Sequence, residues 1–110
     1  MTSWSNWVAF PDPRQREYLC APIGPGVYEL RRSDTKELVL RGMGSNCAYR
    51  MTSLLPLPLG QGSRRNARKR EYVLEHLDCI EYRTCPCETE SEAKALEVQL
   101  HRSEPCLFPT

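Results

Sequence analysis

The sequence has no apolar run long enough to cross a membrane as a helix. Its first residues also lack the basic start and the apolar core of a secretory signal peptide. An excess of one charge is missing too, since 15 Lys and Arg residues nearly balance 14 Asp and Glu residues. We therefore expect an intracellular, cytoplasmic protein with no membrane partner, and the net charge alone identifies no other partner.

Paired CxxC units are absent, although the chain has six cysteines. Cys85 and Cys87 stand close together after Cys79, but His76 and His101 lack the spacing of zinc ligands. Without a sign of secretion, disulfides are not expected either. We expect reduced thiols in the core or in loops rather than a metal–thiolate site.

The length of 110 residues, 40% of them hydrophobic, allows one small domain with a modest core. Residues 1–23 contain several prolines together with Trp4, Trp7 and Phe10. We expect this segment to be an irregular N-terminal arm whose aromatic side chains pack on a domain formed by residues 24–110. A weaker hypothesis gives the arm a role in protein binding.

Apolar periodicity and breaker residues predict a mixed fold. Thr89 and Glu92 have the spacing of a capping box, which marks the start of the last helix. The fold class is α/β (α+β), a small three-stranded, mostly antiparallel sheet flanked by helices. The expected strands are 27–32, 37–41 and 79–84, and the expected helices are 46–54, 64–77 and 90–102, with Ser45 or Asn46 capping the first.

Two charged residues stand on helix faces that should be apolar. Glu97 shares a face with Ala93 and Leu100, and Arg50 lies beside Met51 and other apolar residues. Burying a charge is costly unless it is paired. A structural ion pair between Arg50 and Glu97 is one explanation, and a functional site is the other.

Several short motifs, in order, are similar to those of the GIY-YIG nuclease domain. Gly42 is followed eight positions later by a helical arginine, and a glutamate lies on a late helix before a proline, as in that family. The resemblance covers about residues 24–108. The residues that carry it are Gly26-Val27-Tyr28, Leu40-Arg41-Gly42, Arg50, Glu97 and Pro105.

The resemblance implies a metal-dependent endonuclease that cleaves a DNA phosphodiester bond with one divalent cation, Mg²⁺ or Mn²⁺. Glu97 would be the metal ligand, because a hard cation prefers carboxylate oxygen and can keep several waters. Arg50 would bind the phosphate through its planar donor fork. Tyr28 would hold or deprotonate the attacking water, unless it is an ordinary strand aromatic.

The chain departs from the family pattern at several positions. Leu40 stands where the family usually has a tyrosine, and Met43 stands where a lysine is frequent. The asparagine usual after the late proline is also missing, and Asn46 and Tyr49 are candidates to replace the lost polar groups. These losses favour an alternative function, a nucleic-acid-binding module of the same fold with weakened catalysis.

Basic residues gather at the start of the second expected helix. Phosphate contacts from such a cluster give affinity that does not depend on base sequence and that falls with salt. We therefore predict that it binds DNA, whereas a solvated helix face is the simpler interpretation. The cluster consists of Arg64, Arg65, Arg68, Lys69 and Arg70.

Overall fold

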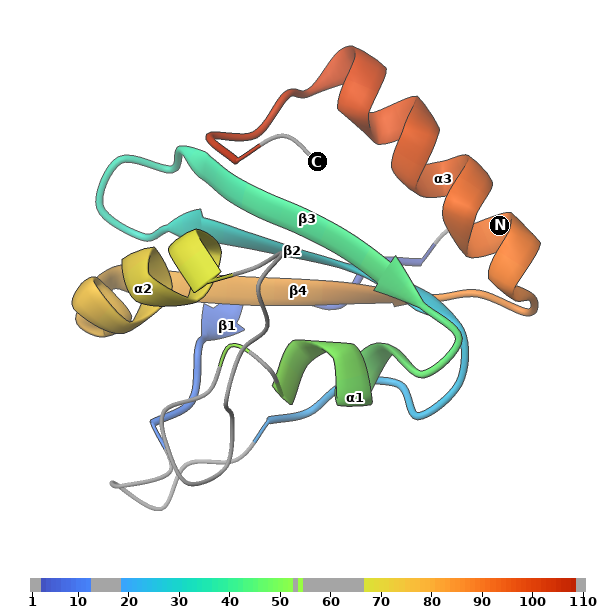
Figure 1. The fold of residues 1–110 in the computed structure, drawn as a ribbon, viewed down its shortest axis with the longest axis horizontal. Coiled ribbons are helices and arrows are strands. Elements are labelled where there is room, and N and C mark those ends of the chain that lie inside the picture. Colours follow the sequence, from blue (N-terminus) through green and yellow to red (C-terminus); the bar gives the residue numbers. More distant parts are fainter. Residues whose placement is uncertain (1–2, 13–18, 53, 55–66, 109–110) are drawn as a thin grey trace.

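A computed structural model describes residues 3–12, 19–52, 54 and 67–108. They form one antiparallel sheet of four strands in the order β1-β4-β2-β3, with helices packed on it (Figure 1). The strands are β1 (Val8–Ala9), β2 (Gly26–Arg32), β3 (Leu38–Gly44) and β4 (Ile80–Pro86). Strand β2 is central and pairs with both β3 and β4. The expected α+β class is confirmed.

The three expected strands are present, and the arm contributes a fourth that the sequence analysis did not predict. Val8 pairs with Tyr82 and Ala9 with Glu81. The Phe10 N–H then donates to the Ile80 carbonyl at 2.9 Å, and the Phe10 ring packs edge-on against Tyr82. A two-residue strand is too short for apolar alternation to reveal it. Its stability comes from this pairing and from the burial of Phe10.

The helices are α1 (Cys47–Thr52), α2 (Ala67–Glu75), the 3-10 turn η2 (Leu77–Cys79) and α3 (Glu90–Ser103). Asn46 caps α1, because its Oδ1 accepts from the Tyr49 N–H at 3.0 Å. Thr89 caps α3 in the same way, accepting from the Glu92 N–H. Both caps agree with the sequence. None of the described helices is long and apolar enough to cross a membrane.

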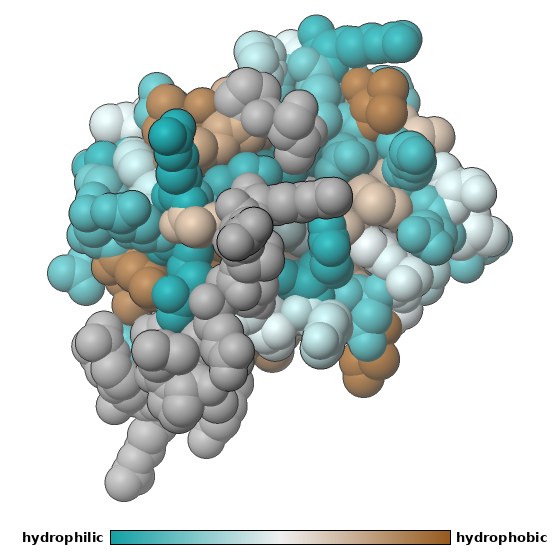
Figure 2. Space-filling model, in the orientation of Figure 1, coloured by the Kyte–Doolittle hydropathy of each residue, from teal (hydrophilic) through white to brown (hydrophobic). Residues whose placement is uncertain are grey.

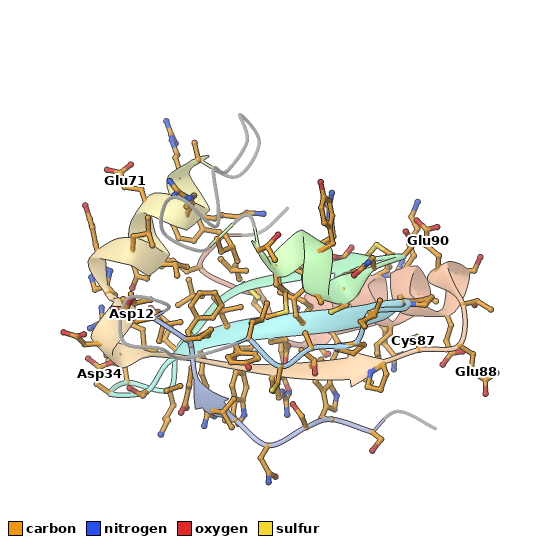
Figure 3. All side chains as sticks on the ribbon, turned by 90° about the horizontal axis from the view of Figure 1, so that it is seen from below. Asp12, Asp34, Glu71, Cys87, Glu88 and Glu90 are labelled. Atoms are coloured by element: carbon orange, nitrogen blue, oxygen red, sulfur yellow. The ribbon has the colours of Figure 1, made fainter. Side chains whose placement is uncertain are left out.

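Helices α1 and α2 lie on one side of the sheet, whereas the segment before β1 runs along the other side (Figure 3). Helix α3 contacts β3 and β2. The main core lies between the sheet and α1 and α2, and it includes Leu30, Leu40, Met51, Leu54, Val73, Ile80 and Tyr82. The apolar stripe read from the sequence therefore fixes how α1 packs.

The other side of the sheet holds a buried ionic network across three strands. Glu29 is fully buried, and its carboxylate accepts from Arg41 Nε at 2.7 Å and from Arg83 Nε at 2.8 Å. Arg41 Nη1 lies 3.2 Å from His101 Nδ1 on α3. Trp4 covers the Arg83 guanidinium at 4.2 Å. This network ties α3 and the N-terminal arm to the sheet.

Candidate active site

The candidate site begins with the packing of Tyr28 against the glycine opposite it. Tyr28 on β2 pairs directly with Gly42 on β3. A Cβ atom built on Gly42 would lie 2.2 Å from Tyr28 Oη and 2.3 Å from Cζ. The phenol therefore lies over the bare backbone of β3, where it is 8% exposed. Any side chain at position 42 would displace it.

Arg50 lies over the next glycine on the same face of β3. A Cβ atom built on Gly44 would lie 2.5 Å from Arg50 Cγ. Helix α1 is held there by the preceding loop, since the Cys47 N–H donates to the Gly24 carbonyl at 3.0 Å and Ala48 N–H donates to Pro22 at 2.8 Å. The sequence analysis placed Arg50 on an inward face, which is wrong, because Arg50 is exposed. Its stem crosses Gly44 instead of entering the core.

Glu97 is half-buried on α3, on the helix turn that follows the fully buried Ala93. The expected inward face of α3 thus agrees with the structure. Within the described residues, Glu97 takes part in no hydrogen bond and no ion pair, so it does not form the structural pair with Arg50.

The charges of Arg50 and Glu97 both act on the Tyr28 phenol. Burial raises the pKa of Tyr28 to about 12; Arg50 opposes this rise, and Cys47 and Glu97 add to it. The phenol is therefore protonated at neutral pH. Arg50 on α1 and Glu97 on α3 are thus both close enough to Tyr28 on β2 for their charges to act on the phenol.

A shallow pocket of about 240 Å³ adjoins this site. Arg50 lines it, whereas Tyr28 and Glu97 do not, so the pocket extends from one side of the three-residue group. Figure 3 shows Glu90 on the same side of the sheet as α1. The other lining residues are Met43, Gly44, Ser45, Asn46 and Tyr49. The sequence analysis missed the contribution of Glu90, because its position suggested only a helix N-terminus.

Leu40, which replaces the expected tyrosine, is 1% exposed and belongs to the apolar core. It pairs with Leu30 on the neighbouring strand. Its position therefore adds no hydroxyl to the site. Met43 lines the pocket. At this position, where the family often has a charged lysine, the chain therefore has a neutral thioether.

The six cysteines are free thiols. Burial raises the pKa of Cys47 to about 12, with smaller contributions from Cys87 and Cys85. The Cys47 thiol is therefore neutral at physiological pH. In the described part of the chain, His, Cys, Asp and Glu side chains form no group of three or more that can hold a metal ion.

The predicted DNA-binding cluster lies away from the Tyr28 site. Arg68, Lys69 and Arg70 are on α2, at the opposite end of the sheet from α1 (Figure 1), and Arg64 and Arg65 lie outside the described residues. Helix α2 contacts the far end of β2, where Arg32 Nη1 donates to Tyr72 Oη at 3.3 Å. Arg32 lies four residue steps along β2 from Tyr28, roughly 13 Å.

The face seen in Figure 2 is largely hydrophilic, and its apolar residues form small separate groups. Arg68 is exposed, and Lys69 and Arg70 are half-buried. The described members of the cluster, Arg68, Lys69 and Arg70, thus lie apart from the three-residue site, and a ligand common to both would have to extend along the sheet.

Replacing Gly42 with Ala should destabilise the fold, because the new methyl group would overlap the Tyr28 ring. We expect a loss of about 1–3 kcal/mol in the free energy of unfolding, measured in urea. Gly24→Ala is the matched control, since nothing lies within 4 Å of its added Cβ. A Gly42→Ala protein as stable as the control would contradict the packing. In a Tyr28→Ala background, Gly42→Ala should cost less than it does in the wild type, which a double-mutant cycle measures.

The raised pKa of Tyr28 predicts a loss of stability at high pH. Folding favours the protonated phenol, so its contribution is complete below pH 10 and is lost as the pH rises toward 12. Between these values, the free energy of unfolding should fall with pH more steeply in the wild type than in Tyr28→Phe, by about 1.4 kcal/mol per pH unit. Urea titrations measure both slopes. Tyr49→Phe, at an exposed site, should keep the wild-type slope. Equal slopes for wild type and Tyr28→Phe would exclude a buried phenol.

Comparison with known proteins gives a fold and no closer relationship. No family model matches the chain, and no curated protein matches it. A solved structure does: the GIY-YIG N-terminal endonuclease domain of UvrC from Thermotoga maritima, bound to its catalytic divalent cation, magnesium. The match has a TM-score of 0.63 and 21% identity, and covers 92% of this chain and 100% of that chain. The chain therefore has the fold of a GIY-YIG endonuclease domain.

Proposed function

We propose that this protein is a divalent-metal-dependent endonuclease that cleaves DNA phosphodiester bonds. The observation that carries the proposal is the packing of Tyr28 and the Arg50 stem over Gly42 and Gly44, with the Glu97 charge of a third element also acting on the phenol. A hydroxyl, a guanidinium and a carboxylate together can hold water, phosphate and a cation. The fold shared with a magnesium-bound endonuclease domain supports the same activity.

Glu97 is suited to hold Mg²⁺ or Mn²⁺. Its carboxylate is partly exposed, and it has no hydrogen-bonding or ion-pairing partner among the residues described. One carboxylate with several waters is a coordination that Mg²⁺ commonly accepts. When bound, the cation would stabilise the charge on the phosphate and on the leaving oxygen. Arg41 and Arg83 lie beside Glu29 rather than Glu97, so Glu97 is not already neutralised by them.

Arg50 and Tyr28 would act on the phosphate and on the water. The exposed Arg50 guanidinium can donate two parallel hydrogen bonds to phosphate oxygens. Tyr28, protonated at neutral pH, would position the water by hydrogen bonding. Because the Glu97 carboxylate raises the pKa of Tyr28, neutralising that carboxylate would lower it. Burial is the largest cause of the raised pKa and Glu97 the smallest, so a cation at Glu97 would reverse only a small part of the rise, and the phenol would act as a hydrogen-bond donor or acceptor to the water.

Glu97→Gln tests this function directly. Nicking of plasmid and branched DNA in Mg²⁺ or Mn²⁺ should fall at least ~100-fold, because the amide is a weaker ligand for a hard cation. Glu92→Gln removes the same charge from an exposed position on the same helix and should keep full activity. Circular dichroism checks that both variants are folded. Metal-dependent nicking of equal rate in wild type and Glu97→Gln would contradict the assigned role.

A DNA-binding module with weakened catalysis is the second candidate. Two observations favour it: Leu40 lies in the apolar core, and burial raises the pKa of Tyr28 rather than lowering it. Salt-dependent DNA binding without cleavage of plasmid, branched or single-stranded substrates would support this module. Cleavage that Glu97→Gln abolishes would exclude it.

The basic residues of α2 are proposed to contact the DNA backbone at a distance from the cleaved bond. Replacing Arg68, Lys69 and Arg70 with Ser should weaken binding and reduce the salt slope by about 0.9 for each phosphate that is no longer neutralised. Fluorescence anisotropy over a range of salt concentrations measures both quantities. The charge-preserving control exchanges Arg for Lys and Lys for Arg at the same positions. If the Ser variant and this control have the same salt slope, α2 is only a solvated helix face.

A further inference from the structure

One of the residues that line the pocket beside Arg50 carries an exposed aromatic ring. Tyr49 is 74% exposed and directly precedes Arg50 on α1. Both polar backbone groups of Tyr49 form hydrogen bonds to side chains. Its N–H donates to Asn46 Oδ1 at 3.0 Å, and its carbonyl accepts from Thr52 Oγ1 at 2.6 Å. The backbone that carries the ring is therefore fixed next to the proposed phosphate site. Few other large apolar side chains in the described chain are this exposed.

The lining of the pocket selects a flat, uncharged ligand. Tyr49 and Met43 give it an aromatic and a thioether surface, and Ser45 and Asn46 give it hydroxyl and amide groups. Arg50 and Glu90 line the pocket with opposite charges; the guanidinium is assigned to the phosphate of the strand, and the carboxylate repels a second phosphate. At about 240 Å³ the pocket is smaller than most pockets for drug-sized ligands, so it fits one ring system. A nucleobase has these properties.

We propose that this pocket receives an unpaired nucleobase, stacked on Tyr49, from the strand whose phosphate Arg50 binds. The proposal rests on the proposed function for the role of Arg50. A base in a duplex is already stacked and paired, so its plane is not accessible to Tyr49 unless the nucleotide is extruded or single-stranded. The substrate class is thus DNA with unpaired nucleotides, such as branched or single-stranded segments.

Binding to two strands that differ only in their bases tests the pocket. An oligothymidylate is compared with an abasic strand of the same length, in EDTA so that cleavage does not occur. Tyr49→Ala should raise the Kd for oligothymidylate roughly 5- to 100-fold, and it should leave the Kd for the abasic strand unchanged. Tyr49→Phe should bind like the wild type, because stacking needs the ring and not the hydroxyl. Val98→Ala, at another exposed apolar side chain, is the matched control.

Two results would contradict base binding in this pocket. One is an equal Kd of the wild type for oligothymidylate and for the abasic strand, and the other is an unchanged Kd for oligothymidylate in Tyr49→Ala. Failure of the proposed function looks different. If the Tyr49-dependent base preference is present but no substrate is cleaved in Mg²⁺ or Mn²⁺, base binding in the pocket is supported and the nuclease function is contradicted. If Glu97→Gln abolishes cleavage but Tyr49→Ala changes no Kd, the nuclease function is supported and base binding in the pocket is contradicted.

Discussion

The close approach of side chains to the bare backbone of β3 is the constraint on which the site depends. Gly42 and Gly44 present no side chain toward α1, and Tyr28 and the stem of Arg50 occupy that space. The phenol is thereby buried and its pKa rises, while the guanidinium remains exposed. Larger residues at either glycine would separate the two groups. The positions of these two side chains therefore follow from the packing of β2, β3 and α1.

The opposite side of the sheet holds the strands in register. Successive side chains of a strand alternate between faces, so Tyr28 points toward α1 and Glu29 points away from it. Glu29 bonds Arg41 and Arg83 on the two neighbouring strands, and His101 of α3 contacts Arg41. A buried ion pair is weak support for stability. Its geometry, however, places α3, and with it Glu97, against the edge of β3.

The sequence predicted the parts of the structure that local patterns encode. The caps at Asn46 and Thr89, the hairpin and the sheet-facing side of α3 follow from spacing and residue type. The exposure of Arg50 could not be predicted in this way. It depends on a contact between α1 and β3, where the Arg50 stem crosses Gly44, which has no side chain. The ionic network around Glu29 was missed for the same reason: strand order, not sequence distance, brings its members together.

The proposed function requires a divalent cation to bind at Glu97, close to Tyr28 and Arg50. Paramagnetic broadening by Mn²⁺ of assigned backbone amide signals measures this directly and does not depend on turnover. In the wild type we expect selective broadening of the amide signals around Glu97 and Gly42 and at Arg50. In Glu97→Gln these signals should not broaden. Broadening that persists in Glu97→Gln, or that centres on the exposed acids Glu88 and Glu92, would contradict it.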